Sequence, residues 1–379
     1  MGSFIQHVID HLPSSKRAVR NVHTKLDRLE QQVSGLQAML ALQESLMHEQ
    51  LQQLQRYEQL QQELRTEVLT NRAQASLFDW SLFRRDGEDD RSAQQRFFAQ
   101  LPQATGTVRL IQRGCAGLLQ EFAAIAHKHQ LPYWVDFGTL LGAVRHQGFI
   151  PWDDDVDLSM MRDDITRLCA LLKDDPELVQ RYRVTLIYDP YACCRQLRFR
   201  YADDKNPCFL DIFFYDYKGA WSSQERDCFI ELRRQLKADL HSLSFYNEWC
   251  EQGYWPVGHP HTDEVEAVFA KYQRLVHKEG ILAEKTTSQG IVCGLDNVDG
   301  ECAYTVANDD IFPLQTMRFE SFEVLAPVHV EAVLAQLYGD IYQLPDDIIS
   351  HFQHIDRAAL EDPAQARVIE EGIASNPWI

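Results

Sequence analysis

The chain has 379 residues, of which 45% are hydrophobic and 11% aromatic, so it can bury a sizeable core and is not intrinsically disordered. It carries 37 Lys and Arg residues against 56 Asp and Glu residues, which gives a formal charge of -19. A field of this sign repels phosphate backbones, so nonspecific nucleic-acid binding is excluded as a default function.

A long helix is predicted over residues 16–72, where Leu, Gln, Glu and Arg dominate and no Pro occurs. A heptad frame fits this segment, with three glutamines as polar exceptions at core positions. The apolar a and d positions are Leu26, Leu29, Val33, Leu36, Leu40, Met47, Leu54, Tyr57, Leu64 and Val68, and the exceptions are Gln43, Gln50 and Gln61. The pattern predicts a coiled-coil arm over residues 1–83 that makes the chain a homo-oligomer. A long helix packed on its own catalytic domain is the alternative.

A solvated linker is predicted over residues 84–108, because the charged stretch RRDGEDDRS at 84–92 contains Gly and lacks an apolar pattern. The catalytic domain is then expected over residues 109–379. It opens with apolar residues at helical spacing from Arg109 to Gln130, followed by a first strand from Tyr133 to Phe137.

Short apolar runs separated by turn-rich or helical segments predict an α+β fold, a mixed sheet with flanking helices. The runs are Val156 to Met160, Val184 to Tyr188, Gln196 to Tyr201 and Phe209 to Tyr215. Residues 222–245 and 262–278 have a helical apolar stripe, so a helical insertion is expected at 220–290. A further helical region is expected after Pro327.

An anion-binding turn is predicted where Gly138 and Thr139 follow the first strand and open a helix. Backbone N–H groups at a helix start point toward an anion, and glycine lets a phosphate approach closely. Arg145 lies at the far end of the same helix, where its cation could face that anion.

An acidic run follows, with Asp153, Asp155 and Asp157 at alternate positions before an apolar stretch. In an extended segment these three carboxylates share one face and repel one another. One or two Mg²⁺ or Mn²⁺ ions would keep all three ionised. A solvated acidic loop or a calcium-binding surface is the alternative, which the following apolar strand disfavours.

A further carboxylate, Asp211, interrupts the apolar stretch FLDIFF at 209–214. Burying this charge without a partner would cost several kcal/mol, so it needs a metal or a basic partner. The sequence leaves two interpretations open, a third metal ligand or a buried salt bridge with Arg198 or Arg200.

Targeting signals are lacking in the sequence as given. It contains no run of eighteen apolar residues and no leader of signal-peptide type, and its nine cysteines include no C-x-x-C pair. These features predict a reducing, cytoplasmic location without a transmembrane segment. Peripheral association with the inner face of a membrane stays open.

Three motifs resemble the LicD family, which includes the fukutin-related proteins and belongs to the nucleotidyltransferase-fold superfamily. They are FGTLLGAVRHQGFIPWDDDVDLSM at 137–160, LDIFFYD at 210–216 and FPLQTMRFESFEVLAPVHVEAVLAQLYGDIYQLP at 312–345. The resemblance covers about residues 115–350 and excludes the amino-terminal helix.

The resemblance implies a nucleotidyltransferase-like fold and a metal-dependent phosphotransferase. Such an enzyme moves phosphocholine, or a similar phospho-linked group such as a phospho-alditol, from a CDP-linked donor to a hydroxyl of a glycan acceptor. The acceptor would be a cell-surface glycan of lipopolysaccharide, capsule or teichoic-acid type. By motif position Asp155 and Asp157 are similar to the paired metal ligands and Asp211 to the third carboxylate, with Asp153 as a weaker candidate.

Two other functions stay open: nucleotidyl transfer from CTP, and a noncatalytic scaffold of a glycan-assembly complex. A choline-bearing donor would favour an aromatic cage around its quaternary ammonium, although aromatic residues at this density are more often ordinary core. The candidates are Tyr188, Tyr191, Phe213, Tyr215, Tyr246, Trp249, Tyr254 and Trp255.

Overall fold

The computed structural model describes residues 83–189, 194–252, 260–297, 303–343 and 363–376, together with scattered positions between 7 and 61. The chain divides into two compact units, Met1–Phe78 and Asp79–Ile379. The described amino-terminal positions from 21 onward are helical, and the predicted coiled coil depends largely on residues outside the described set.

The second unit is built on a mixed sheet, which confirms the predicted α+β class. Its main path runs β1-β2-β5-β4-β3, where β2 and β5 are parallel and the other neighbours antiparallel. The strands are β1 (Trp134–Val135), β2 (Asp157–Met161), β3 (Tyr182–Asp189), β4 (Cys194–Tyr201) and β5 (Phe209–Lys218). The second half of β5 also pairs with β6 (Gly290–Cys293), which in turn pairs with β7 (Thr305–Ala307).

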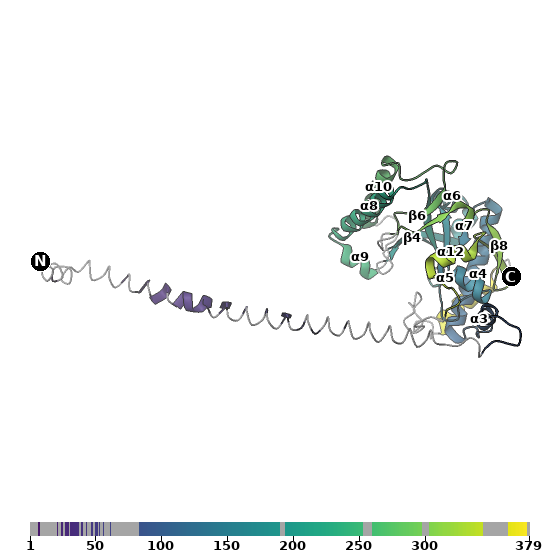
Figure 1. Ribbon diagram of the computed structural model, residues 1–379, viewed down its shortest axis with the longest axis horizontal. Helices are drawn as coiled ribbons and strands as arrows, with labels where there is room; N and C mark the ends of the chain where they lie inside the picture. Colours follow the sequence, from purple (N-terminus) through teal and green to yellow (C-terminus); the bar gives the residue numbers. More distant parts are fainter. Residues whose placement is uncertain are drawn as a thin grey trace. The chain divides into compact units, whose positions relative to one another are not determined.

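Helices cover this sheet and complete its core (Figure 1). The long helix α4 packs on β5, and Phe122 of α4 contacts the ring of Phe199 of β4. The flanking helices are α4 (Gly106–His129), α5 (Phe137–His146), α6 (Arg162–Asp174), α7 (Pro176–Arg181), α11 (Asn308–Ile311), α12 (Val330–Tyr338) and α13 (Pro363–Ala374). Within the described ranges, no helix has the length and apolar character needed to cross a membrane.

The range predicted as a linker, 84–108, contains the helix α3 (Asp90–Ala99). Its start is stabilised by Asp89, whose carboxylate accepts a hydrogen bond from the Ser92 backbone N–H at 2.7 Å. The apolar residue near its other end, Phe98, is fully buried against α5. Charge density at 84–92 hid this helix, because its capping residue Asp89 and its first two residues, Asp90 and Arg91, are charged.

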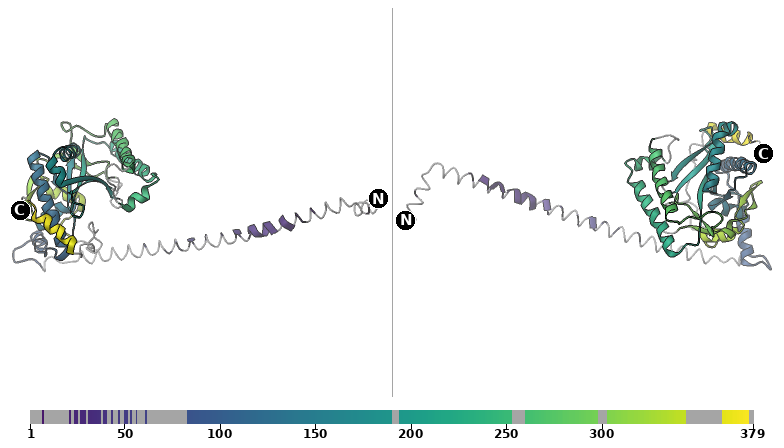
Figure 2. Two further views of the ribbon diagram at one scale, coloured as in Figure 1. Left: turned by 180° about the vertical axis from the view of Figure 1, so that it is seen from behind. Right: turned by 90° about the horizontal axis from the view of Figure 1, so that it is seen from above.

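The expected helical insertion contains α8 (Ser223–His241), α9 (Tyr246–Gln252) and α10 (Pro260–Lys278). The helices α8 and α10 run side by side in both views of the molecule (Figures 1 and 2). They enclose a hydrophobic cluster separate from the main core, with Phe229, Leu236 and Val276 at its centre. The insertion therefore stabilises its own helices.

A buried ionic network joins this insertion to the sheet. Arg162 donates to both carboxylate oxygens of Asp216 at 2.7 Å and also contacts Asp296. Arg195 contacts Asp296 from the other side and donates to Glu266 of α10 at 2.9 Å. Two guanidinium groups thus pair with three carboxylates, and we call these five residues the ionic network.

Candidate active site

The two predicted acidic segments meet on neighbouring strands. In the parallel pair β2–β5, Asp157 is the register partner of Asp211. Paired residues of adjacent strands project from the same face of a sheet, so both carboxylates lie on one face. The adjacent core residues Leu158 and Ile212 occupy the opposite face.

Asp157 lies among other carboxylates and is half-buried. Burial raises its pKa well above the usual range, and the negative charges of Asp155, Asp153 and Asp211 raise it further. Among the described residues, no group donates a hydrogen bond to its carboxylate. We call Asp153, Asp155, Asp157 and Asp211 the acidic cluster. The four carboxylates of the acidic cluster lie close together, and none of the described residues neutralises the charge of Asp157.

Asp211 has protein partners. The Arg198 side chain donates from Nε and from a terminal nitrogen to the two carboxylate oxygens, both at 2.8 Å. Gln196 donates to the same carboxylate. This ion pair is one of the two interpretations that the sequence left open, and it coexists with the register pairing of Asp211 and Asp157.

The predicted phosphate-binding turn adjoins the cluster. A Cβ atom at Gly138 would lie 3.0 Å from Oδ2 of Asp153 and 4.0 Å from Oδ2 of Asp157, so a side chain there would require the Asp153 carboxylate to shift. The Thr139 hydroxyl accepts a hydrogen bond from the Asp157 backbone N–H at 2.8 Å. Thr139 thus fixes the start of β2.

Asp136, a residue that sequence reasoning did not select, organises the floor of this site. It is 1% exposed, and its carboxylate accepts hydrogen bonds from the Phe137 backbone, Ser159 and Tyr215 at 2.8 to 3.1 Å. Burial raises its pKa. Its position between a strand and a helix start was the available signal, because Asp is a preferred residue before the first helical turn.

The loop that carries the aspartates is held from the opposite side by a clamp of three side chains. Gln112 donates to the carbonyl oxygen of Asp153 at 2.8 Å. Glu320 accepts two hydrogen bonds from Arg109, at 3.0 and 2.6 Å, and its backbone N–H donates to the Gln147 carbonyl at 2.7 Å. Glu320 lies in the turn of the hairpin formed by β8 (Gln315–Phe319) and β9 (Phe322–Ala326).

Arg145 is placed at the other end of α5 from Gly138. Its guanidinium stacks over the Phe98 ring at 3.7 Å and is 7% exposed. Burial lowers its pKa to about 10. The structure therefore groups Gly138 and Thr139 with the acidic cluster and leaves Arg145 in a separate environment.

Aromatic side chains border the cluster. The ring centroid of Phe137 lies 4.7 Å from that of Phe213 and 6.5 Å from that of Tyr304. Tyr338 of α12 is 44% exposed; its partial burial raises its pKa, and the charges of Asp157 and the neighbouring aspartates raise it further.

The other aromatic candidates lie elsewhere. Tyr215 donates to Asp136, and Tyr246 and Trp249 pack in the core of the insertion. The side chains of Tyr188, Tyr191, Tyr254 and Trp255 lie outside the described residues.

The chemistry of the cluster fits a hard divalent cation. Carboxylate oxygens are the ligands that Mg²⁺ and Mn²⁺ prefer, and none of the residues described in the structure donates a hydrogen bond to the two carboxylate oxygens of Asp157. Among the described residues, no three or more His, Cys, Asp or Glu side chains are positioned together to hold a metal ion. Arg198 explains part of this, because it engages both oxygens of Asp211.

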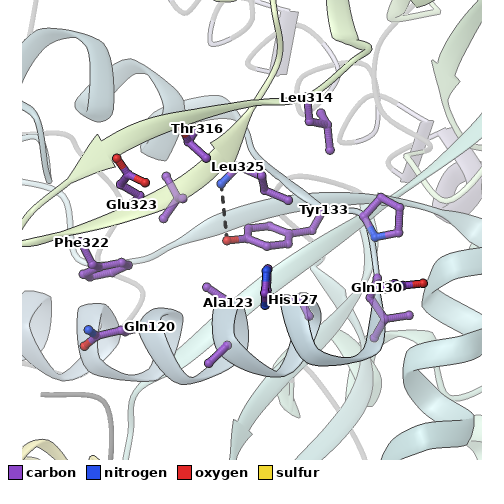
Figure 3. A pocket seen from close by; sticks show the side chains of 15 residues that line it. Gln120, Ala123, His127, Gln130, Tyr133, Leu314, Thr316, Phe322, Glu323 and Leu325 are labelled. Atoms are coloured by element: carbon purple, nitrogen blue, oxygen red, sulfur yellow. Dashed lines mark hydrogen bonds between the residues drawn. The ribbon is translucent and has the colours of Figure 1, made fainter.

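A separate cavity of about 760 Å³ lies between α4 and the β8–β9 hairpin (Figure 3). Tyr133 lines it, and its hydroxyl accepts a hydrogen bond from the Leu325 backbone N–H at 3.5 Å. No aspartate lines this cavity, so it is distinct from the acidic cluster.

Comparison with known proteins identifies one protein family. The family described as LicD/FKTN/FKRP, nucleotidyltransferase domain, matches residues 130–249. This range contains every member of the acidic cluster, together with Gly138, Thr139 and Arg198.

Curated relatives match over stretches of similar length. The lipopolysaccharide cholinephosphotransferase LicD of Haemophilus influenzae is 34% identical over 122 residues, which covers 29% of this chain and 44% of that protein. An uncharacterised protein of Rickettsia prowazekii is 33% identical over 118 residues, covering 27% and 42%, respectively. The chain therefore spans less than half the length of these curated relatives.

Proposed function

We propose that the chain is a metal-dependent phosphotransferase, on the premise that residues 130–249, which match the LicD/FKTN/FKRP nucleotidyltransferase domain, form a domain of that family. It moves phosphocholine from a CDP-activated donor to a hydroxyl of a cell-surface glycan of lipopolysaccharide type. The observation that carries the proposal is the pairing of Asp157 with Asp211 on neighbouring parallel strands, where Asp157 has no protein donor among the described residues.

Asp153, Asp155 and Asp157 would hold Mg²⁺ or Mn²⁺, and Asp211 would complete the set. The bound ion supplies charge neutralisation for the diphosphate of the donor. Gly138 leaves space for a phosphate oxygen beside Asp153, and the positive end of the α5 dipole favours that anion. Thr139 keeps the Asp157 backbone in register for the reaction. In-line attack by the acceptor oxygen then releases CMP.

The aromatic border supports choline as the headgroup. Phe137, Phe213 and Tyr304 pack on one another, and Phe213 lies two residues after Asp211 on β5. A quaternary ammonium is attracted by aromatic rings and by negative charge. Phe137 has a φ of 43°, a left-handed conformation that non-glycine residues rarely adopt. Such backbone strain persists where the surrounding structure fixes a side chain for a task.

Product analysis tests the proposal. We expect the full chain with Mg²⁺ and CDP-choline to release CMP. Asp157→Asn should slow this release about 10²- to 10³-fold, and added EDTA should abolish it. Pyrophosphate released from CTP, without CMP from any CDP-linked donor, would instead establish nucleotidyl transfer. Release of neither product would favour the scaffold function.

We also propose that the amino-terminal unit joins two or more copies of the chain. Leu29, Val33, Leu36 and Leu40 occupy heptad core positions there and are 52 to 65% exposed. An exposed apolar stripe on a helix is stabilised by pairing with another copy. Deleting residues 1–80 should lower the mass measured by light scattering and leave CMP release intact; an unchanged mass would contradict the oligomer. The proposed location is the cytoplasm, peripheral to the inner face of a membrane.

A further inference from the structure

We propose that Arg198 is a binding residue for the diphosphate of the donor, and that the free enzyme holds it in an ion pair with Asp211. The inference rests on the proposed function and adds a residue to its site. It also assigns an order of events, in which the cation and the donor replace the partners that Asp211 and Arg198 have in the free enzyme.

The register of three adjacent strands places the groups in a row. Asp157 on β2 pairs with Asp211 on β5, and Asp211 pairs with Arg198 on β4. Neighbouring strands are about 4.8 Å apart, so the row spans roughly 10 Å from the first backbone to the third. A diphosphate is bound most favourably when one end meets a cation held by carboxylates and the other meets a fixed positive group. The row supplies both.

The Arg198 side chain is more exposed than that of its ion-pair partner. Its side chain is 20% exposed, whereas that of Asp211 is 3% exposed. The guanidinium lies over the Phe209 ring at 3.5 Å, which restricts it to one plane without using any of its N–H groups. A guanidinium held in this way presents a planar fork that suits two phosphate oxygens.

The charges at the site explain why Arg198 would exchange Asp211 for the donor diphosphate. In the free enzyme, Arg198 compensates Asp211, while Asp157 has no compensating donor among the described residues. A divalent cation at the cluster neutralises Asp211 and so weakens its attraction for Arg198. The Arg198 guanidinium can then bind the diphosphate of the donor after a small movement of its side chain.

Arg200 provides a matched control on the same strand. It lies two positions further along β4, its side chain is 19% exposed, and it pairs with Asp204, which is 65% exposed. It differs from Arg198 in having no contact with Asp211. Arg200→Gln therefore removes one arginine of equal exposure without touching the acidic cluster.

Calorimetric titration of the full chain separates the two roles. We expect Arg198→Gln to bind Mn²⁺ alone about 3- to 10-fold more tightly, because one competing cation is removed. With Mn²⁺ saturating, the same variant should bind CDP about 10- to 100-fold more weakly, because a charge-assisted bidentate contact is lost. Arg200→Gln should change neither affinity by more than about 2-fold.

Opposite signs in the two titrations are the signature of the proposal. If Arg198→Gln weakens Mn²⁺ binding as well, or leaves CDP binding unchanged, Arg198 only supports Asp211 and the inference is overturned. Arg198→Lys guards against misfolding, because it keeps the charge and should weaken CDP binding by about 5-fold with Mn²⁺ affinity near wild type. CDP binding does not depend on turnover. A wild-type chain that binds CDP through Arg198 but releases no CMP would therefore refute the proposed reaction and leave this inference standing.

Discussion

Two aspartates on the same strand, Asp211 and Asp216, each pair with an arginine, but the groups around these two ion pairs differ. Asp216 belongs to the ionic network, where two guanidinium groups serve three carboxylates. Asp211 belongs to the acidic cluster, where Arg198 is its ion-pair partner and its register neighbour Asp157 has no donor among the described residues. A buried carboxylate that is paired with an arginine stabilises the fold. A carboxylate without a cationic partner favours the binding of a cation.

The largest effect should come from removing the carboxylate that both arginines of the ionic network contact. Asp296→Asn leaves Arg162 and Arg195 with one fewer carboxylate in a region where Asp296 is 3% exposed. We expect the free energy of unfolding to fall by about 3 to 5 kcal/mol, measured by urea denaturation. Asp204→Asn, an exposed partner of Arg200, is the control and should leave stability unchanged. Comparable stability of the two variants would remove the distinction between network and surface pairs.

A substitution in the acidic cluster should lower activity without lowering stability. Asp157→Asn should reduce turnover about 10²- to 10³-fold, as expected for loss of electrostatic stabilisation at the reacting group. Its pKa is raised in the folded state, so above that pKa its ionisation opposes folding. Denaturation of the metal-free variant at neutral pH should therefore give a stability equal to or above wild type. A clear loss of stability would show that Asp157 is a structural residue.

Metal addition should sharpen the contrast. With Mg²⁺ at 100 times its dissociation constant, wild type should gain about 2.7 kcal/mol in the free energy of unfolding. Asp157→Asn should gain much less, whereas Asp204→Asn should gain as much as wild type. Thermal unfolding with and without EDTA measures each gain. An equal gain in all three proteins would place the cation outside the acidic cluster.

The smallest predicted effect concerns the clamp behind the acidic loop. Glu320→Gln weakens the bidentate contact with Arg109 and should lower stability by about 1.5 kcal/mol. The apparent Mg²⁺ affinity should also fall, because the loop carrying Asp153 loses part of its support. Glu323→Gln, in the same hairpin but exposed, should alter neither quantity. Unchanged Mg²⁺ affinity in Glu320→Gln would mean that the clamp does not position the loop.

Local pattern was sufficient to predict much of this arrangement. The interrupted apolar runs predicted β2 and β5, and therefore the strands whose register pairs Asp157 with Asp211. The glycine that opens α5 was also identified from its position after a strand. These predictions succeeded because alternation and turn chemistry depend on residues close together in the chain.

Contacts between distant segments could not be predicted in the same way. Glu320 and Arg109 are 211 positions apart, and Arg162 and Asp296 are 134 apart. Nothing in the local pattern of either pair specifies its partner, because sheet order and helix packing bring them together. The same reason explains why Tyr338 of α12 was not associated with the aspartates.

The clamp has a consequence for dissecting the protein. A fragment limited to residues 130–249 would contain all the carboxylates of the cluster, yet it would lack Gln112, Arg109 and Glu320. The range matched by the family is therefore shorter than the segment that we expect to be needed for a complete acidic cluster with its supporting residues. Excised alone, that stretch should fail to bind divalent ions tightly, although each ligand is present.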